Sequence, residues 1–147
     1  MPGNRLQHLS QNDWILLQAK ASRHTYRVGE EIIRQGTRGE SLFIIRRGEA
    51  RVELAGAGSR SVVATLGPDD VCGEMAFLEH GNSTAAVVAR DDEVEVDEFE
   101  WRELRAIFEA FPGLASRFYL SLAVILAKRL RVTSKELARE LARERKT

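Results

Sequence analysis

The chain has 147 residues, of which 44% are hydrophobic and 30% charged, and its 22 basic side chains balance its 22 acidic ones. This length predicts one ordinary soluble domain that needs no disulfide or metal to fold, because a chain of this size buries about two-thirds of its unfolded surface. Its single cysteine excludes a disulfide framework and a multi-cysteine zinc site, and no run of about 18 apolar residues predicts a membrane span, so we expect a cytoplasmic protein.

The charges are sorted along the chain. Residues 91–109 contain nine acids and two bases, whereas residues 128–146 contain eight bases and three acids. Such a separation organises elements or subunits more often than it binds a polyanion. We therefore expect no nucleic-acid partner, although the basic C-terminal segment keeps that alternative open.

The first expected elements are one or two short helices within residues 6–21, where Ser10 and Asp13 are candidate helix caps. From Thr25 onward the pattern changes to short runs typical of strands, separated by turns that contain glycine. The expected strands span residues 25–28, 31–34, 41–47, 49–54, 61–66, 71–72, 85–89 and 93–99. Their regular spacing predicts a closed or double-layered antiparallel sheet.

Two helices are expected after the strands. Residues 100–110 form a short amphipathic pattern that Phe111-Pro112-Gly113 interrupts, so residues 1–113 are one predicted part of the domain. Residues 114–147 form the other part, a long helix with frayed residues after Leu141. An apolar stripe follows this helix through Leu122, Leu126, Leu130, Thr133, Leu137 and Leu141. About 30 helical residues extend about 45 Å, beyond a sheet of this size. The far half therefore predicts a homodimer through this helix, with a solvated helix end as the alternative.

The stretch between residues 71 and 78 is the strongest candidate for a binding site. Gly73 and Glu74 stand between a strand and residues of good helix propensity, so free backbone amides at the helix start would face an anion. A glycine before a short helix is also a simple turn. Met75, Phe77 and Leu78 are expected in the core of this helix, and Cys72 as a small buried hydrophobic residue.

Gly73-Glu74-Met75-Ala76-Phe77-Leu78, with Ala85-Ala86 opening the next strand, resembles the phosphate-binding cassette of the cyclic nucleotide-binding domain family. The resemblance extends over residues 6–141. It implies a mainly β fold with flanking helices: an antiparallel β-roll of the double-stranded β-helix or jelly-roll type, with N-terminal helices and a long C-terminal helix. It also implies cyclic AMP or cyclic GMP as the ligand, and no other cofactor.

The segment Arg129 to Ser134 is similar to the dimerisation helix of the catabolite activator group within this family. The resemblance implies that Glu74 accepts the ribose 2′-hydroxyl and pairs with Arg129, and that Thr133 and Ser134 read the base. The remaining residues of the implied ligand site are Gly73, Met75, Ala76, Thr84 and Ala85. The alternatives are a surface carboxylate for Glu74, a solvated base for Arg129 and a register-setting polar residue for Thr133.

One position departs from the family pattern. The family places an arginine two residues after the position of Asn82, where this sequence has Thr84. A charge-assisted bond contributes about 1.5–3 kcal/mol, so its loss corresponds to a tenfold to hundredfold weaker affinity. His80 or Arg60 would supply a charge if the loops bring them near. The sequence therefore predicts a sensor that binds cyclic nucleotide weakly.

Two alternatives stay open for the function. One is a ligand-free dimerisation or protein-interaction module of the same fold, and the other is a fragment of a transcription regulator that lacks its helix-turn-helix. The sequence contains no nucleophile elbow, no phosphate loop with Gly-Lys-Ser/Thr and no cluster of metal ligands, so neither an enzyme nor a metal site is expected. The acidic run at residues 91–100 is expected to be a solvated strand face.

Overall fold

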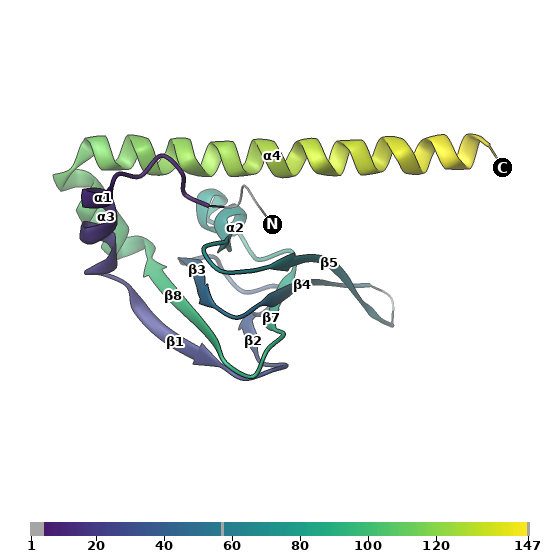
Figure 1. Cartoon of the computed structure of the whole chain (residues 1–147), viewed down its shortest axis with the longest axis horizontal. Helices are drawn as coiled ribbons and strands as arrows, with labels where there is room; N and C mark the ends of the chain where they lie inside the picture. The colour runs from purple at the N-terminus through teal and green to yellow at the C-terminus, as the bar shows by residue number, and fades with distance from the viewer. Residues whose placement is uncertain (1–4, 57, 147) are drawn as a thin grey trace.

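Eight strands form two four-stranded antiparallel sheets in the computed structural model, which describes residues 5–56 and 58–146. One sheet has the order β1-β8-β3-β6 and the other β2-β7-β4-β5. The strands are β1 Ser22–Tyr26, β2 Glu31–Ile33, β3 Ser41–Arg47, β4 Ala50–Ala55, β5 Arg60–Leu66, β6 Val71–Cys72, β7 Ala86–Ala89 and β8 Val94–Glu100. Figure 1 shows this roll lying along one long helix. The predicted β-roll with flanking helices is confirmed.

Alternation along each strand divides the apolar residues between two layers. One layer fills the inside of the roll and includes Ile45, Cys72, Val87 and Val96. The other lies between the outer face of the first sheet and the helices. It includes Leu42, Ile44, Val71, Phe77, Leu104 and Phe118. Successive strand residues point to opposite faces, so one strand such as β3 supplies both layers.

Between residues 5 and 21 the structure has one helix, α1, at Gln11–Gln18. Ser10 and Asp13 form the predicted cap, since each side chain accepts a hydrogen bond from the other residue's backbone amide. Asp13 also accepts two hydrogen bonds from Arg117, at 2.6 and 2.8 Å. The hydrogen bond from Arg117 holds the pKa of Asp13 well below its usual range. These bonds tie α1 to the long helix.

The expectation that residues 91–100 present a solvated acidic face is wrong at Asp97, which is 1% exposed. Asp97 accepts hydrogen bonds from Arg23 Nε at 2.9 Å and from Arg46 Nε at 2.8 Å. Burial raises the pKa of Asp97, but the two arginines outweigh this effect, so the pKa lies below its ordinary value. Pairing of β1 with β8 places Arg23 directly opposite Asp97. The acid is therefore part of the packing between the sheet and the helices.

Two helices follow β8: α3 at Trp101–Ala110 and α4 at Pro112–Arg145. The long helix begins two residues earlier than predicted, because proline is favoured in the first turn, where its missing N–H has no partner to lose. The predicted fraying after Leu141 is wrong, since α4 continues to Arg145. Arg143 and Arg145 lie in the last turn, where basic side chains complement the helix dipole.

Only the first half of α4 packs on the domain. Its buried residues are Leu114, Phe118, Ser121, Leu122 and Ile125. Beyond them Leu130, Leu137 and Leu141 are 68%, 59% and 50% exposed. In Figure 1 this half continues past the roll. No described helix is long and apolar enough to cross a membrane.

Candidate functional site

The short helix α2, at Glu74–Glu79, is placed by two glycines. Gly73 precedes it with a φ of 81°, in the left-handed region, and a Cβ there would lie 3.1 Å from Ile33 Cδ1. A Cβ at Gly39 would lie 2.5 Å from the Ala76 backbone, so the loop before β3 packs directly on α2. Side chains at either position would displace α2, which therefore has a fixed position against the roll.

Glu74 points away from solvent and toward α4. The residue is 4% exposed, and its carboxylate accepts a hydrogen bond from Arg129 Nη1. Arg129 Nη2 donates to the carbonyl oxygen of Val71 at 2.8 Å. Burial raises the pKa of Glu74, partly offset by the charge of Arg129. The predicted pairing of Glu74 with Arg129 is confirmed, and it joins α2, β6 and α4.

The contact with Val71 was not predicted. A backbone carbonyl carries no sequence signal, and it is the position of β6, which begins at Val71, that brings this one near α4. It leaves Arg129 with a second acceptor besides Glu74, so the guanidinium is held in one orientation. The Glu74 carboxylate is thus a buried, oriented hydrogen-bond acceptor.

The other residues of α2 divide between core and surface. Phe77 is 1% exposed and Leu78 partly buried, as predicted, whereas Met75 is 52% exposed, so its predicted core position is wrong. Residues three apart share one face of a helix, so Glu74 and Phe77 point inward together and Met75 points outward. Cys72 is buried, as predicted, and burial raises the pKa of its thiol well above its ordinary value.

The remaining predicted site residues lie at the surface. Thr84 is exposed and Ala85 partly buried in the segment that leads into β7. Thr133 and Ser134 are exposed on α4, about one turn beyond Arg129. Within residues 5–56 and 58–146 the hydroxyls of these two residues form no hydrogen bond. The structure therefore brings together Gly73, Glu74, Ala76 and Arg129, and leaves Thr133 and Ser134, the residues predicted to read the base, open to solvent.

Arg60 and His80 were the side chains expected to replace the charge of the family arginine, and the structure gives both of them other contacts. Arg60 lies 3.5 Å from Glu53 and 4.0 Å from Glu31, so two carboxylates already neutralise it. The ring of His80 packs edge-on against Trp101, with 5.6 Å between ring centroids. Arg60 is therefore already paired with carboxylates, and the His80 ring lies against Trp101.

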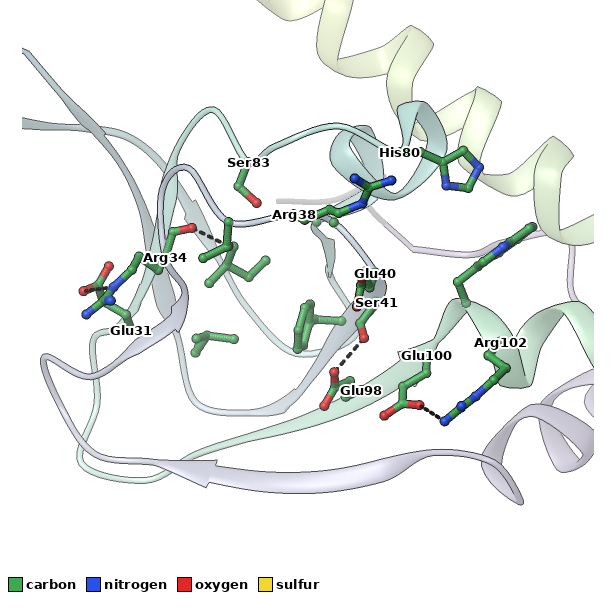
Figure 2. Close-up of a pocket in the computed structure, with 17 residues that line it drawn as sticks. Glu31, Arg34, Arg38, Glu40, Ser41, His80, Ser83, Glu98, Glu100 and Arg102 are labelled. Atoms are coloured by element: carbon green, nitrogen blue, oxygen red, sulfur yellow. Dashed lines mark hydrogen bonds and ion pairs between the residues drawn. The ribbon is translucent and has the colours of Figure 1, made fainter.

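A cavity of about 850 Å³ opens at the mouth of the roll, between the start of β3, the end of β8 and the loops around residues 36–39 and 80–83, and it shares only Gly73 with the residues grouped around Glu74. We call it the roll-mouth cavity. Figure 2 shows Arg38 and His80 on one side of it, and Ser41 and Glu98 on the other. Glu74, Arg129, Thr133 and Ser134 do not line it. Sequence reasoning missed this cavity, because its walls come from segments far apart in the chain.

Residues 23–111 match the family model for the cyclic nucleotide-binding domain. The chain is 35% identical over 135 residues to cyclic GMP-binding protein C of Dictyostelium discoideum, covering 86% of this chain and 5% of that protein. It is 33% identical over 143 residues to the cyclic AMP receptor protein of Thermus thermophilus, covering 93% of this chain and 62% of that protein.

The solved structures agree with the sequence matches. The crystal structure of the Thermus thermophilus catabolite activator protein superposes with a TM-score of 0.76 and 29% identity, over 90% of this chain and 61% of that chain. This chain therefore spans less than two-thirds of the length of each of these three relatives.

Proposed function

This chain belongs to the cyclic nucleotide-binding domain family, and from this membership we propose that it is a regulatory module that binds cyclic AMP or cyclic GMP. The observation that carries the proposal is the buried pair of Glu74 and Arg129. A carboxylate held by a guanidinium is a strong, directed acceptor, and it suits the 2′-hydroxyl of a ribose. Relatives named for binding cyclic GMP and cyclic AMP support the ligand class.

The proposed output is a change in the position of α4. A nucleotide whose ribose binds Glu74 and whose base binds Thr133 and Ser134 would contact α2 and α4 at once. Such a ligand binds best to one placement of the helix and so shifts the population toward it. Arg129 is the residue that both parts of the site share, since it contacts Glu74 and lies one turn before Thr133.

The proposed affinity is weak because Thr84 supplies no charge for the phosphate. We expect calorimetric titration of the wild-type chain with cyclic AMP and cyclic GMP to show weak binding of at least one of them. Thr84→Arg should strengthen that binding about tenfold to hundredfold, the value of one charge-assisted bond. Wild type and Thr84→Arg that both show no heat at millimolar nucleotide would favour the ligand-free interaction module instead.

The matched control for this variant is Ser83→Arg, which places the same charge one residue earlier. Ser83 lines the roll-mouth cavity whereas Thr84 is exposed, so the two arginines would lie in different surroundings. We expect the control to leave nucleotide affinity within about threefold of wild type, well below one charge-assisted bond. Stronger binding by Ser83→Arg than by Thr84→Arg would contradict the role proposed for Thr84.

We also propose that two copies pair through the exposed half of α4. Leu130, Leu137 and Leu141 continue the apolar stripe there, and their side chains are exposed rather than packed against other described residues. Helices with apolar residues every three or four positions bury them against one another as coiled coils. We assign this face to a second copy of the chain. The same apolar stripe packs against the roll at Leu122, and its continuation would pack against the matching stripe of the second copy.

Leu137→Asp tests the dimer. A charge in the apolar seam should raise the dimer dissociation constant about tenfold or more, as measured by sedimentation equilibrium. Leu54→Asp is the control, since Leu54 is a 44% exposed leucine on β4 outside the stripe, and it should leave the dimer unchanged. A wild-type chain that sediments as a monomer at high micromolar concentration would contradict the pairing.

A further inference from the structure

The roll-mouth cavity is built on rigid backbone. Gly36 and Gly39 donate to the carbonyl oxygens of Ser83 and Gly81, at 2.7 and 2.9 Å, and Ser83 donates to that of Thr37 at 2.7 Å. The bridge between Arg38 and Asn82 completes this pairing of the two loops. The backbone of these two loops is therefore held in place at Arg38 and Ser83 before any ligand arrives, which lowers the entropy cost of ordering the loops on binding.

One wall of the cavity carries hydrogen-bond acceptors. Glu98 accepts from the Ser41 hydroxyl at 2.6 Å, and its other oxygen lies 2.9 Å from His24 Nε2. Each carboxylate oxygen has two lone pairs, so both remain able to accept from a ligand. The orientation of Glu98 is fixed by these two contacts, as Figure 2 shows for Ser41.

The opposite side carries a free positive charge. Most charged residues of the lining are paired: Glu31 lies 3.9 Å from Arg34, and Glu100 lies 3.6 Å from Arg102. Among the described residues, the side chains of Arg38 and Glu40 form no ion pair or hydrogen bond, and both line the cavity. The described lining thus offers a ligand one arginine, Arg38, and two carboxylates, Glu40 and Glu98, none of which is paired with a lysine or an arginine.

Apolar and aromatic groups complete the lining. Phe43 and Ile33 contribute from inside the roll, and Trp101 lies next to His80 at the rim. A volume of about 850 Å³ falls within the range of small-molecule sites, about 300–1,000 Å³. The cavity therefore combines an apolar surface with a few oriented polar groups, the usual composition of a ligand site.

We propose that the roll-mouth cavity binds a small zwitterion, an amino acid or dipeptide, at a site distinct from Glu74 and Arg129. Its anionic group pairs with Arg38, its ammonium group faces Glu98 and Glu40, and its body packs on Trp101 and Phe43. A purely anionic ligand would meet the carboxylates of Glu40 and Glu98, and a purely cationic one would meet Arg38. A ligand with both charges satisfies both sides.

Trp101 supplies the readout for the test. The chain has two tryptophans, and Trp14 lies elsewhere, beneath Arg46. A full-length chain with Trp14→Phe therefore reports on the cavity through Trp101 alone. We would titrate it with the twenty amino acids and their alanyl dipeptides, and then titrate the tightest-binding compound in its N-acetylated and carboxamide forms.

At least one zwitterion should change the Trp101 emission saturably, and each derivative that lacks a charge should bind about tenfold or more weakly. Arg38→Gln should weaken binding by a similar factor, whereas the control Arg34→Gln, on the same rim but beside Glu31, should change it less than twofold. No saturable change with any compound would overturn the proposal, as would equal binding of the carboxamide form or unaltered binding by Arg38→Gln.

Cyclic nucleotide separates this site from the one proposed at Glu74. Calorimetric binding of cyclic AMP or cyclic GMP should persist in Arg38→Gln, and nucleotide should not displace the zwitterion. Loss of nucleotide binding in Arg38→Gln would assign the cavity to the nucleotide and overturn the second site. Failure of the zwitterion titrations alone would leave the nucleotide proposal standing.

Discussion

Asp97→Ala is expected to lower the free energy of unfolding by about 1.5–3 kcal/mol, the usual contribution of hydrogen bonds to a charged group. Asp97 is 1% exposed and is the shared acceptor of Arg23 and Arg46. Without it, the half-buried guanidinium of Arg46 loses its closest acceptor. Urea unfolding followed by circular dichroism should show a lower midpoint with an unchanged slope.

Glu95→Ala is the matched control for this variant. Glu95 lies on the same strand and the same face. However, its carboxylate is 3.9 Å from the nearest guanidinium nitrogen of Arg23, and its side chain is 33% exposed. We expect this loss to cost less than about 1 kcal/mol, as for other exposed pairs. Equal effects of the two substitutions would contradict the structural role assigned to Asp97.

The effect of Asp97 also depends on pH. Its pKa in the folded chain lies below the value of about 3.9 expected in the unfolded chain. The unfolded state therefore takes up protons first on acidification, so the contribution of Asp97 is fully present above about pH 5. It is lost as the pH falls through the folded pKa. The stability difference between wild type and Asp97→Ala should shrink accordingly below about pH 4.

Glu74→Gln is expected to weaken cyclic nucleotide binding about tenfold to hundredfold. The amide has the size of the carboxylate but no charge, so the ligand loses a charge-assisted acceptor worth about 1.5–3 kcal/mol, and Arg129 loses its counterion. The measurement is calorimetry in the Thr84→Arg background, where the starting affinity is highest. Glu79→Gln, on the exposed end of the same helix, is the control and should bind as its parent does.

The fold of the chain should survive this substitution. Burial raises the pKa of Glu74 because it disfavours the charged carboxylate, and a neutral glutamine of the same size avoids that cost. Arg129 keeps its hydrogen bond to Val71 in the variant. A Glu74→Gln chain that is folded, as judged by its unfolding midpoint, and binds nucleotide as tightly as its parent would contradict the ribose role.

The strand bounds were predicted best where apolar residues point to both faces of the strand. The bounds of β3 and β6 match the structure, because alternating apolar residues there supply two layers. The prediction placed β1 three residues too late, since Ser22, Arg23 and His24 form a strand only through pairing with β8. Asp97 was misjudged for the same reason: its burial depends on arginines from other strands.

The candidate site was predictable only in part. The pairing of Glu74 and Arg129 followed from motifs that carry a resemblance, although 54 residues separate them in the chain. The exposure of Met75 depends on the rotation of a helix of six residues, too short to show a periodic pattern. The roll-mouth cavity is lined by charged residues from separate segments of the chain. No sequence pattern distinguishes them from other surface charges, so the cavity could not be predicted.

Because α4 is one uninterrupted helix, a tilt at its middle would move its C-terminal end. No glycine or proline interrupts residues 114–145, so nothing in the helix favours a kink that would absorb a tilt. Arg145 lies about 24 Å beyond Arg129 along the axis, at 1.5 Å per residue. A rotation of about 5° about Arg129 would therefore carry the last turn roughly 2 Å sideways. If a ligand at Glu74 moves α4 as proposed, the helix would turn as one rigid rod about Arg129.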